Sequence, residues 1–458
     1  MKSQKDIKYY GLTSNRPFSS HVAYAARIGS KMAAFMDSKK GVEYDAIAKG
    51  TPFFLPGSDR LVTIAFKGKK QFVVIDDKPG PEFDGVSDVL FSLDQKQFVY
   101  KALDGKTQSV VLNNKPDAGF KQIIGGPFFS LNSKRFAYAA RDWDGGCYLL
   151  INHETTGPFS DIKDLSFSPD SKHVTCSVLK DKTWYLWKDG LLGKGYENVT
   201  SIVWSPDSSR MAYVAQTDKK LFLVERDKEH PPYTTVSVPQ FSPDSRHLVY
   251  PSQKDKKWRM VFDGKEGRPF DLLALHMFSP DSSHYAYVGV KKEKAFMVYD
   301  GEPGKSHDMI TDMAFSPDSG HLAYIAQDKD KGFVVMDKKP CKAYPSVHHL
   351  AFSRDSSKLA YIAIVDKKNI LVINEQESNV YDAVGLPVFS LDNLNVAYVA
   401  FNGKNWIWVV NGHEIDLKIN RIIDTAPLVF DGPDALHGLG IILSPEPEFI
   451  RFDVSLIR

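Results

Sequence analysis

Short apolar runs separated by polar turns follow one another along the whole chain. Residues 308–344 illustrate the pattern with four such runs, at 308–315, 321–326, 332–336 and around Tyr344. The runs are rich in β-branched and aromatic residues and are bounded by Pro, Gly, Asp and Ser, which is typical of β-strands. No segment keeps a helical period of 3.6 over three turns. The pattern therefore predicts an all-β protein.

One phrase, an aromatic residue followed by Ser-Pro-Asp-Ser or a close variant, recurs at nearly constant spacing. The serine after the aromatic residue, called the marker serine below, occurs nine times at intervals of 37 or 38 residues. More divergent copies surround Phe18, Phe54 and Phe430, which brings the number of copies to twelve. A four-stranded antiparallel unit of this length is typical of a β-propeller blade. The marker serines are Ser92, Ser130, Ser168, Ser205, Ser242, Ser279, Ser316, Ser353 and Ser390.

Twelve copies leave two arrangements open. Propellers usually have about 4–8 blades, so residues 1–233 and 234–458 could form two six-bladed propellers. However, the marker spacing is constant from Ser168 to Ser390, without a linker midway. The spacing therefore favours a single domain over residues 1–458, a propeller of twelve blades.

The two ends of the chain complement each other in their apolar runs. The last copy has runs around Leu428, at 436–443 and at 449–456, and lacks a fourth. The run at 7–12 places an aromatic residue eight positions before Phe18, as fourth strands do elsewhere. We therefore expect one closed ring in which residues 7–12 complete the last blade, leaving no open sheet edge.

Repeated residues have structural explanations. Pro sets φ in the marker turn and Asp accepts backbone N–H bonds there, so the repeated Asp residues are interpreted as turn residues rather than catalytic carboxylates. An aromatic residue eight positions before that of the marker phrase is expected to pack between neighbouring blades. A tyrosine follows most marker serines by eight residues, and Cys176 takes its place in one copy, which indicates that this cysteine is buried.

Charge and cysteine content exclude several classes of function. The formal net charge is +2, from 58 basic and 56 acidic side chains, so nothing favours nucleic acid or an anionic membrane as partner. Three scattered cysteines predict neither a disulfide framework nor a zinc site. The chain has no apolar run of about 18 residues and no apolar signal segment at residues 1–15, so a cytoplasmic protein is expected unless a signal peptide has been removed.

The candidate binding residues lie where the repeat varies, four positions before the marker serine. That position is expected at the start of the inner strand, near one rim of the channel. The candidates are Asp88, Asp164, Asp312 and the neighbouring pair His348 and His349. Because adjacent residues on a strand face opposite sides, the two histidines are not expected to share a metal ion. No catalytic, cofactor-binding or metal-binding residues are predicted.

Two functions remain open from these residues. The first is a non-enzymatic scaffold, a monomer that presents propeller faces to a protein or peptide. The alternative is an enzyme or small-ligand-binding protein with its site in the channel mouth, which would need polar residues converging from several blades. The irregular last copies offer His413, Glu414, Asp434 and His437 for such a site.

The repeat resembles a known family. The phrase from Phe167 to Ser171, with the Leu-Ala-Tyr that follows in several copies, is similar to WD40-like and TolB-like propeller repeats of bacterial proteins. The turns at 263–267 and 300–302 resemble those of bacterial members of unknown role. The family includes a Tol-system periplasmic propeller and the propeller domains of prolyl-oligopeptidase-type enzymes, whose Gly-x-Ser-x-Gly elbow has no counterpart here. The resemblance thus implies the propeller fold and leaves the role open.

Overall fold

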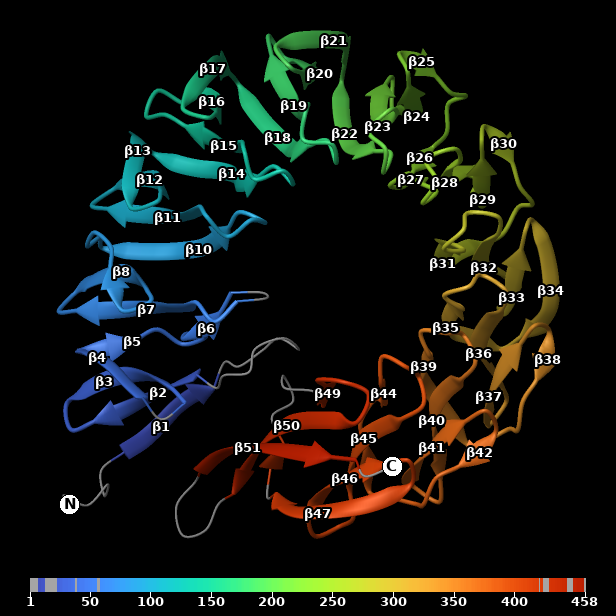
Figure 1. Ribbon diagram of the computed structural model, residues 1–458. Coiled ribbons are helices and arrows are strands. Elements are labelled where there is room, and N and C mark those ends of the chain that lie inside the picture. The colour runs from blue at the N-terminus through green and yellow to red at the C-terminus, as the bar shows by residue number, and fades with distance from the viewer. Residues whose placement is uncertain are drawn as a thin grey trace. The chain divides into compact units, whose positions relative to one another are not determined.

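The protein is all-β, as the sequence pattern predicts. A computed structural model describes residues 7–12, 23–37, 39–55, 58–419, 421–422, 428–442 and 448–456. In this part of the chain every helix or strand is a β-strand, and the strands form twelve sheets, numbered 1 to 12 in chain order (Figure 1). The predicted number of blades is therefore confirmed, although the copy marker at Phe18 lies outside the described residues.

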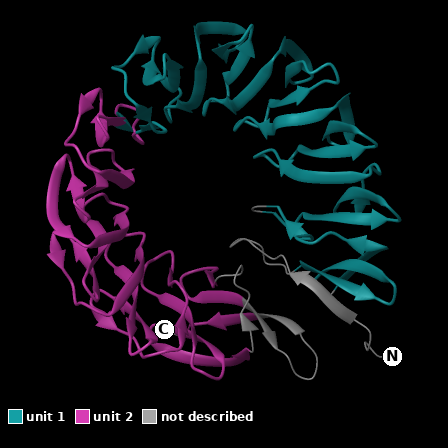
Figure 2. Ribbon diagram, turned by 180° about the vertical axis from the view of Figure 1, so that it is seen from behind, with its two compact units in different colours: residues 1–241, 248–252 teal, residues 242–247, 253–458 magenta. Residues whose placement is uncertain are grey.

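The chain divides into two compact units (Figure 2). Unit 1 comprises residues 1–241 and 248–252, and unit 2 comprises 242–247 and 253–458, so that the boundary falls within sheet 7. Within each unit, neighbouring sheets lie side by side, with the first strands along one side of the row and the fourth strands along the other (Figure 1).

Unit 1 contains the first six sheets. Sheet 1 consists of β1 (Ile7–Leu12), β2 (Ala23–Ile28), β3 (Lys31–Met36) and β4 (Lys39–Tyr44). Sheet 2 consists of β5 (Ala46–Ile47), β6 (Phe53–Phe54), β7 (Leu61–Lys67), β8 (Lys70–Ile75) and β9 (Lys78–Pro79). Sheet 3 consists of β10 (Gly85–Phe91), β11 (Phe98–Asp104), β12 (Thr107–Leu112) and β13 (Lys115–Phe120). Sheet 4 consists of β14 (Gln122–Phe129), β15 (Phe136–Arg141), β16 (Cys147–Ile151) and β17 (Glu154–Phe159). Sheet 5 consists of β18 (Asp161–Phe167), β19 (Val174–Lys180), β20 (Thr183–Lys188) and β21 (Leu191–Tyr196). Sheet 6 consists of β22 (Asn198–Trp204), β23 (Met211–Thr217), β24 (Lys220–Glu225) and β25 (Lys228–Glu229).

The remaining sheets repeat the same plan. Sheet 7 consists of β26 (Thr235–Val236), β27 (Gln240–Phe241), β28 (Leu248–Lys254), β29 (Lys257–Phe262) and β30 (Lys265–Glu266). Sheet 8 consists of β31 (Leu272–Phe278), β32 (Tyr285–Lys291), β33 (Lys294–Tyr299) and β34 (Glu302–His307). Sheet 9 consists of β35 (Met309–Phe315), β36 (Leu322–Asp328), β37 (Lys331–Met336) and β38 (Lys339–Pro340). Sheet 10 consists of β39 (Ser346–Phe352), β40 (Leu359–Val365), β41 (Lys368–Ile373) and β42 (Gln376–Glu377). Sheet 11 consists of β43 (Ala383–Val384), β44 (Val388–Phe389), β45 (Val396–Phe401), β46 (Trp406–Val410) and β47 (His413–Ile419). Sheet 12 consists of β48 (Arg421–Ile422), β49 (Val429–Phe430), β50 (Ala435–Ile442) and β51 (Glu448–Ser455).

Each sheet is an antiparallel meander, in which consecutive strands pair. In sheet 9, for example, β35 pairs with β36, β36 with β37 and β37 with β38. In sheets 2, 7, 11 and 12 two short segments take the place of the first strand, and both pair with the same neighbour. The predicted four-stranded unit is confirmed, and sheet 12 contains the predicted runs as β49, β50 and β51.

The predicted role of residues 7–12 is wrong. The strand β1 pairs antiparallel with β2, with Ile7 opposite Ile28 and Leu12 opposite Tyr24, and so occupies the first position of sheet 1. Antiparallel pairing with a strand close in sequence has a lower loop-closure entropy cost than pairing with the far end of the chain. The aromatic spacing that suggested a fourth strand does not distinguish these two positions.

The marker turn explains the repeated serine and aspartate. In sheet 5 the Ser168 hydroxyl donates to Oδ1 of Asp170 at 2.6 Å and accepts the N–H of His173 at 3.0 Å. The Ser168 hydroxyl and the N–H of Lys172 lower the pKa of Asp170 to about 2. The marker serines are buried, and the same bond joins serine to aspartate in most copies. These aspartates therefore stabilise turns, as their repetition predicted.

The second serine of the phrase connects one sheet to the next. Ser208 of sheet 6 accepts the backbone N–H of Asp170 in sheet 5 at 2.8 Å. The serine lies in the left-handed region, with φ of 63°, which aims its hydroxyl at the neighbouring turn. The same bond recurs between other neighbours: Asp94 to Ser133, Asn132 to Ser171, Asp244 to Ser282, Asp281 to Ser319 and Asp318 to Ser356.

The hydrophobic core lies between adjacent sheets rather than within one. Between sheets 4 and 5 it includes Cys147, Cys176 and Trp187, so the first two cysteines are buried as predicted, whereas Cys341 is half-buried. The predicted aromatic contacts between neighbouring sheets are confirmed. The aromatic ring at the end of one sheet packs against a tyrosine of the next sheet in an edge-to-face arrangement. Examples are Phe83 with Tyr100, Tyr196 with Tyr213, Phe270 with Tyr287 and Tyr344 with Tyr361.

Candidate functional site

The residue four positions before the marker serine, called the bulge residue below, interrupts the first strand of its sheet. In sheet 5 the pairing of β18 with β19 shifts between Lys163 and Ser166, around Asp164. The pairing shifts at the same place in sheets 3, 6, 8 and 10. A β-bulge leaves one residue outside the ladder and re-aims its side chain. The bulge residues therefore lie in the middle of the first strand, not at its start as expected.

The backbone at the bulge favours particular residue types. Six of the nine bulge residues have a positive φ, between 40° and 74°. Gly tolerates this conformation best, and short polar residues adopt it more easily than bulky ones. Five of the six are Gly, Asp, Ser or His, which tolerate a positive φ to different degrees, and the sixth is a bulky residue. The six are Asp88, Gly126, Asp164, Ser201, Leu275 and His349.

Leu275 is the exception, a bulky residue with a φ of 40° in sheet 8. The left-handed conformation costs a residue with a side chain about 1–2 kcal/mol. Burial does not offset this cost, because Leu275 is 41% exposed. The next residue, His276, has a buried Nδ1 without a hydrogen-bond partner in the described residues, and burial lowers its pKa. Neither backbone preference nor packing explains a leucine at this bulge.

Asp88 and Asp164 lie on separate sheets and make contacts within their own sheets. The Nζ of Lys101 lies 3.1 Å from Oδ2 of Asp88. Asp164 accepts a long bond from the Ser177 hydroxyl at 3.4 Å. Both aspartates are exposed. Both are surface carboxylates at a bulge of the first strand. They lie two sheets apart and do not form one site.

Lys163, beside Asp164, is held between two sheets. Its Nζ donates to Oδ1 of Asn198 at 2.6 Å and lies 4.0 Å from the ring centroid of Trp184. Burial lowers the pKa of this lysine. A cation over an indole ring with an amide partner is a stable structural contact. The contacts of Lys163 are therefore structural.

Asp312, His348 and His349 come close together between sheets 9 and 10. Oδ2 of Asp312 accepts the N–H of Leu350 at 3.3 Å. The rings of His348 and His349 are 5.1 Å apart at 85°, so the expectation that they face opposite ways is wrong. The bulge between His348 and Leu350 breaks the alternation of the strand. Burial and the neighbouring His349 lower the pKa of His348.

The other irregular polar residues do not converge. Glu414 accepts the hydroxyl of Tyr381 at 2.8 Å in a contact between fourth strands, and Nδ1 of His437 lies 2.7 Å from Oδ2 of Asp431 in sheet 12. Across the described ranges, no group of three or more His, Cys, Asp or Glu side chains is arranged to hold a metal ion.

Grooves between adjacent sheets occur beside the marker turns. The groove between sheets 5 and 6, called groove 5/6, has a volume of about 460 Å³, and that between sheets 8 and 9, groove 8/9, about 440 Å³. Every residue lining groove 8/9 has a counterpart three repeats earlier in groove 5/6, for example Met297 and Leu186, or Tyr324 and Tyr213. A smaller cavity of about 230 Å³ lies at the equivalent place between sheets 1 and 2.

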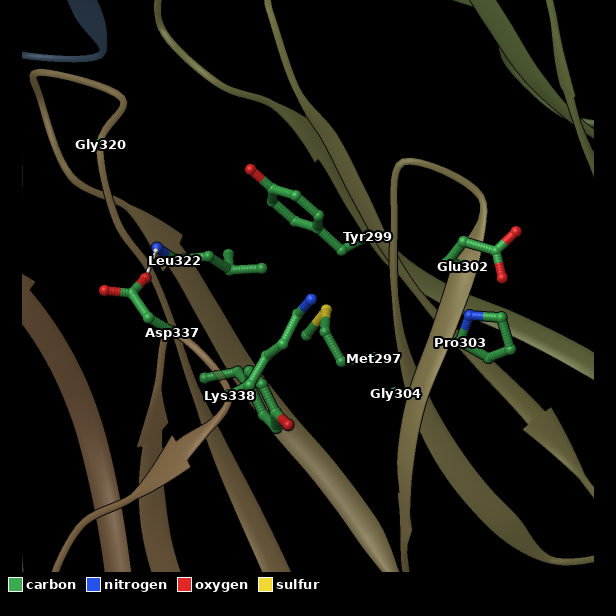
Figure 3. Close-up of a pocket in the computed structure, with 10 residues that line it drawn as sticks. Met297, Tyr299, Glu302, Pro303, Gly304, Gly320, Leu322, Asp337 and Lys338 are labelled. Atoms are coloured by element: carbon green, nitrogen blue, oxygen red, sulfur yellow. Dashed lines mark hydrogen bonds between the residues drawn. The ribbon is translucent and has the colours of Figure 1, made fainter.

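Groove 8/9 follows the repeat. Oδ1 of Asp337 accepts the N–H of Leu322 at 3.1 Å (Figure 3). Its Oδ2 lies 2.6 Å from Nδ1 of His321. Burial, together with three nearby aspartates, raises the pKa of Tyr299. The side chain of Lys338 extends into the cavity (Figure 3). Asp337 therefore caps the second strand of sheet 9, whereas Met297, Leu322 and Tyr324 form apolar parts of the wall.

Groove 5/6 departs from the repeat at three positions. Leu191 and Leu192 begin β21, whereas the other ten fourth strands in the described residues begin with Lys, Glu, Gln or His. Arg226 replaces the Asp or Asn that caps the second strand elsewhere. Trp204 replaces the usual Phe of the marker phrase. Aligning the copies position by position would have revealed these residues, which the sequence analysis did not single out.

One repeat matches a known family model. Residues 150–188 match the model described as WD40, WD domain, G-beta repeat. The match begins at the end of β16 and covers β17, the fourth strand of sheet 4, and the first three strands of sheet 5. The WD40-like repeat suggested by the sequence is thus confirmed for this segment. A comparison with curated proteins finds no match.

Solved structures show distant likenesses. A eukaryotic initiation factor has a TM-score of 0.37 and 13% identity, covering 79% of this chain and 96% of its own. Dihydro-heme d1 dehydrogenase NirN in complex with DHE has a TM-score of 0.30 and 16% identity, covering 64% and 74%. TolB from Acinetobacter baumannii has a TM-score of 0.25 and 14% identity, covering 55% and 77%. These scores are low, and the likenesses carry no argument about function.

None of the described residues belongs to a helix that is long and apolar enough to cross a membrane.

Proposed function

We propose that the protein is a non-enzymatic scaffold that binds a protein or peptide partner through its bulge residues. A rigid sheet supports each bulge residue, while the residue type changes from sheet to sheet. This combination is typical of binding surfaces on repeat proteins. The sequence-derived candidates Asp88, Asp164, Asp312 and His349 belong to this set, and His348 lies beside it.

Leu275 is the observation that carries the proposal. A leucine that is strained and 41% exposed has a backbone cost in the free protein. Strained residues persist where function requires them. Two further large apolar residues are about half exposed: Leu272, which begins the same strand, and Met309, which begins the first strand of sheet 9. An apolar surface of this kind suits a protein or peptide partner.

Replacing Leu275 by Asn tests the proposal, because Asn adopts the left-handed conformation readily. The variant L275N is expected to keep or raise the free energy of unfolding, by up to about 1 kcal/mol, since it relieves backbone strain. It is also expected to lose partners that the wild-type protein captures from cell extract, measured by quantitative mass spectrometry. A loss of binding with unchanged stability separates function from folding.

The matched control is K182N, which places Asn at an exposed turn residue of sheet 5 that is also left-handed, with φ of 64°, but is not a bulge residue. This variant removes no apolar surface and should capture the same partners as the wild-type protein. If L275N captures them equally well, the bulge surface is not the binding surface.

We also propose that residues 1–458 form one propeller domain rather than two six-bladed propellers. The unchanged spacing of 37 residues between marker serines across the middle of the chain supports this. Electron micrographs of single particles should show one disc. Two linked discs would contradict the proposal.

A further inference from the structure

We propose that β21 and groove 5/6 bind an extended peptide segment of a partner protein, one that combines large apolar side chains with carboxylates. The site lies entirely within sheets 5 and 6 of unit 1. It is distinct from the bulge surface, because β18 and β21 are the two opposite edge strands of sheet 5.

The start of β21 lacks the Lys or Pro that seven of the other ten described fourth strands have among their first two residues. Edge strands expose unpaired N–H and C=O groups, and Lys or Pro at an edge hinders the addition of another strand. Six of the other fourth strands begin with Lys, and four have Pro as their second residue. By contrast, β21 begins with two leucines, and its one lysine, Lys194, lies farther along the strand and pairs with Glu229. An extended peptide can therefore pair with β21 as an additional strand.

The side chains next to this edge form an apolar surface. Leu191 is 76% exposed and Leu192 is 41% exposed, although both are large aliphatic residues. Trp204 and Met211 line the same groove. A groove of about 460 Å³ is within the usual range for ligand pockets, about 300–1,000 Å³. Large apolar side chains of the peptide would cover these residues.

The charges in the groove favour a carboxylate. Lys188 lies 5.0 Å from the Trp204 ring centroid, and in the described residues neither Lys188 nor Arg226 has an acidic partner within ion-pair distance. Asp189 already makes hydrogen bonds with Nδ1 of His173 and the N–H of Val174. Asp227 is the remaining acid lining the groove, against two available cations. The guanidinium of Arg226 can bind a carboxylate through two hydrogen bonds.

Three fluorescently labelled peptides test the inference on the full chain. Each has a core of alternating Leu and Thr, flanked by Glu in the first peptide, by Ser in the second and by Lys in the third. Fluorescence anisotropy measures their affinities. We expect the Glu-flanked peptide to bind about tenfold or more tightly than the Lys-flanked peptide, with the Ser-flanked peptide between them, and the difference to shrink at high salt.

Two variants that restore the repeat locate the site. L191K/L192P introduces the Lys-Pro that starts β9, β13 and β38, so the fold has a precedent for it. It should weaken binding of the Glu-flanked peptide about tenfold or more, because the apolar contacts and the open edge are both removed. R226D restores the usual Asp and should reduce the preference for Glu over Lys. K182N, which changes an exposed turn residue of sheet 5 that does not line the groove, should leave peptide binding unchanged.

Other outcomes would overturn the inference. Equal affinity of wild-type protein and L191K/L192P for the Glu-flanked peptide would show that binding occurs elsewhere. A preference for the Lys-flanked peptide, or no binding of any peptide at millimolar concentration, would contradict the assigned chemistry. If sedimentation shows a wild-type dimer that L191K/L192P converts to monomer, the occupant is a second copy of the chain rather than a partner peptide.

Discussion

Groove 5/6 and groove 8/9 are equivalent places in the repeat with different chemistry. They have nearly the same volume, and each has a tyrosine on its floor, Tyr213 and Tyr324. In groove 8/9 Asp337 caps the second strand, and Glu302 and Pro303 begin the fourth strand. In groove 5/6 the corresponding residues are Arg226, Leu191 and Leu192. Function in a repeat protein is therefore best sought where one copy lacks a structural residue that the other copies have.

The tyrosines that line the two grooves, Tyr213 and Tyr324, should contribute equally to the free energy of unfolding. Tyr213 meets Tyr196 edge to face with ring centroids 6.3 Å apart, and Tyr324 meets His307 at 6.1 Å. Y213A and Y324A should each lower the free energy of unfolding by about 3–5 kcal/mol, since both remove a large buried ring. Urea unfolding followed by circular dichroism measures the loss. If only one variant loses stability, the two grooves are not structurally equivalent.

Alkaline pH should act on the same tyrosines. Burial raises the pKa of Tyr213 to about 12, and burial also raises that of Tyr324. The unfolded tyrosine ionises near pH 10, so the stability contributed by neutral Tyr213 is complete below that pH and is lost as the pH rises through about 12. The loss for Tyr213 is about 2–3 kcal/mol. Melting temperatures across this range should fall less steeply for Y213F than for the wild-type protein.

Exchanging the capping residue should have opposite effects in the two grooves. D337R removes the carboxylate that holds the N–H of Leu322 and the ring of His321, and should cost about 1–2 kcal/mol. R226D supplies the missing cap at the start of β23 and should stabilise by about 0.5–1 kcal/mol. Differential scanning calorimetry measures both. Destabilisation by R226D would mean that Arg226 has a structural role of its own, and stabilisation by D337R would contradict the capping role of Asp337.

The smallest effect on stability is expected at the edge of β21. Leu191 and Leu192 are exposed, so L191K/L192P should change the free energy of unfolding by less than about 0.5 kcal/mol. The same holds for the reciprocal change E302L/P303L in groove 8/9. Thermal denaturation checks both variants. A large loss in L191K/L192P would assign these leucines to packing within the fold.

The strands and their number follow from the sequence because turn and strand residues alternate so regularly. The pattern around Phe315 and Tyr324 recurs with little change, and each of its features has a local cause in turn chemistry or in packing between sheets. Pairing partners are less predictable. The run at 7–12 has the apolar character of any strand, and only the structure shows that it pairs with β2.

The candidate site is harder to predict for a different reason. A bulge such as that at Asp164 depends on the pairing of two strands, and alternation along one strand does not reveal it. The same bulge brings the rings of His348 and His349 together, contrary to the expected alternation. Leu191 and Arg226 are visible in the sequence, but their meeting in one groove requires the packing of sheet 5 against sheet 6.

The bond between neighbouring marker turns has a consequence for how such a chain can grow. In six pairs of neighbouring sheets the later repeat contributes a serine hydroxyl and the earlier repeat a backbone N–H, as Ser208 and Asp170 do. A gene duplication that inserts one whole repeat therefore also inserts the serine and the backbone N–H that connect it to its neighbours. The length of the protein can change in evolution by complete units, without any substitution at the new junctions.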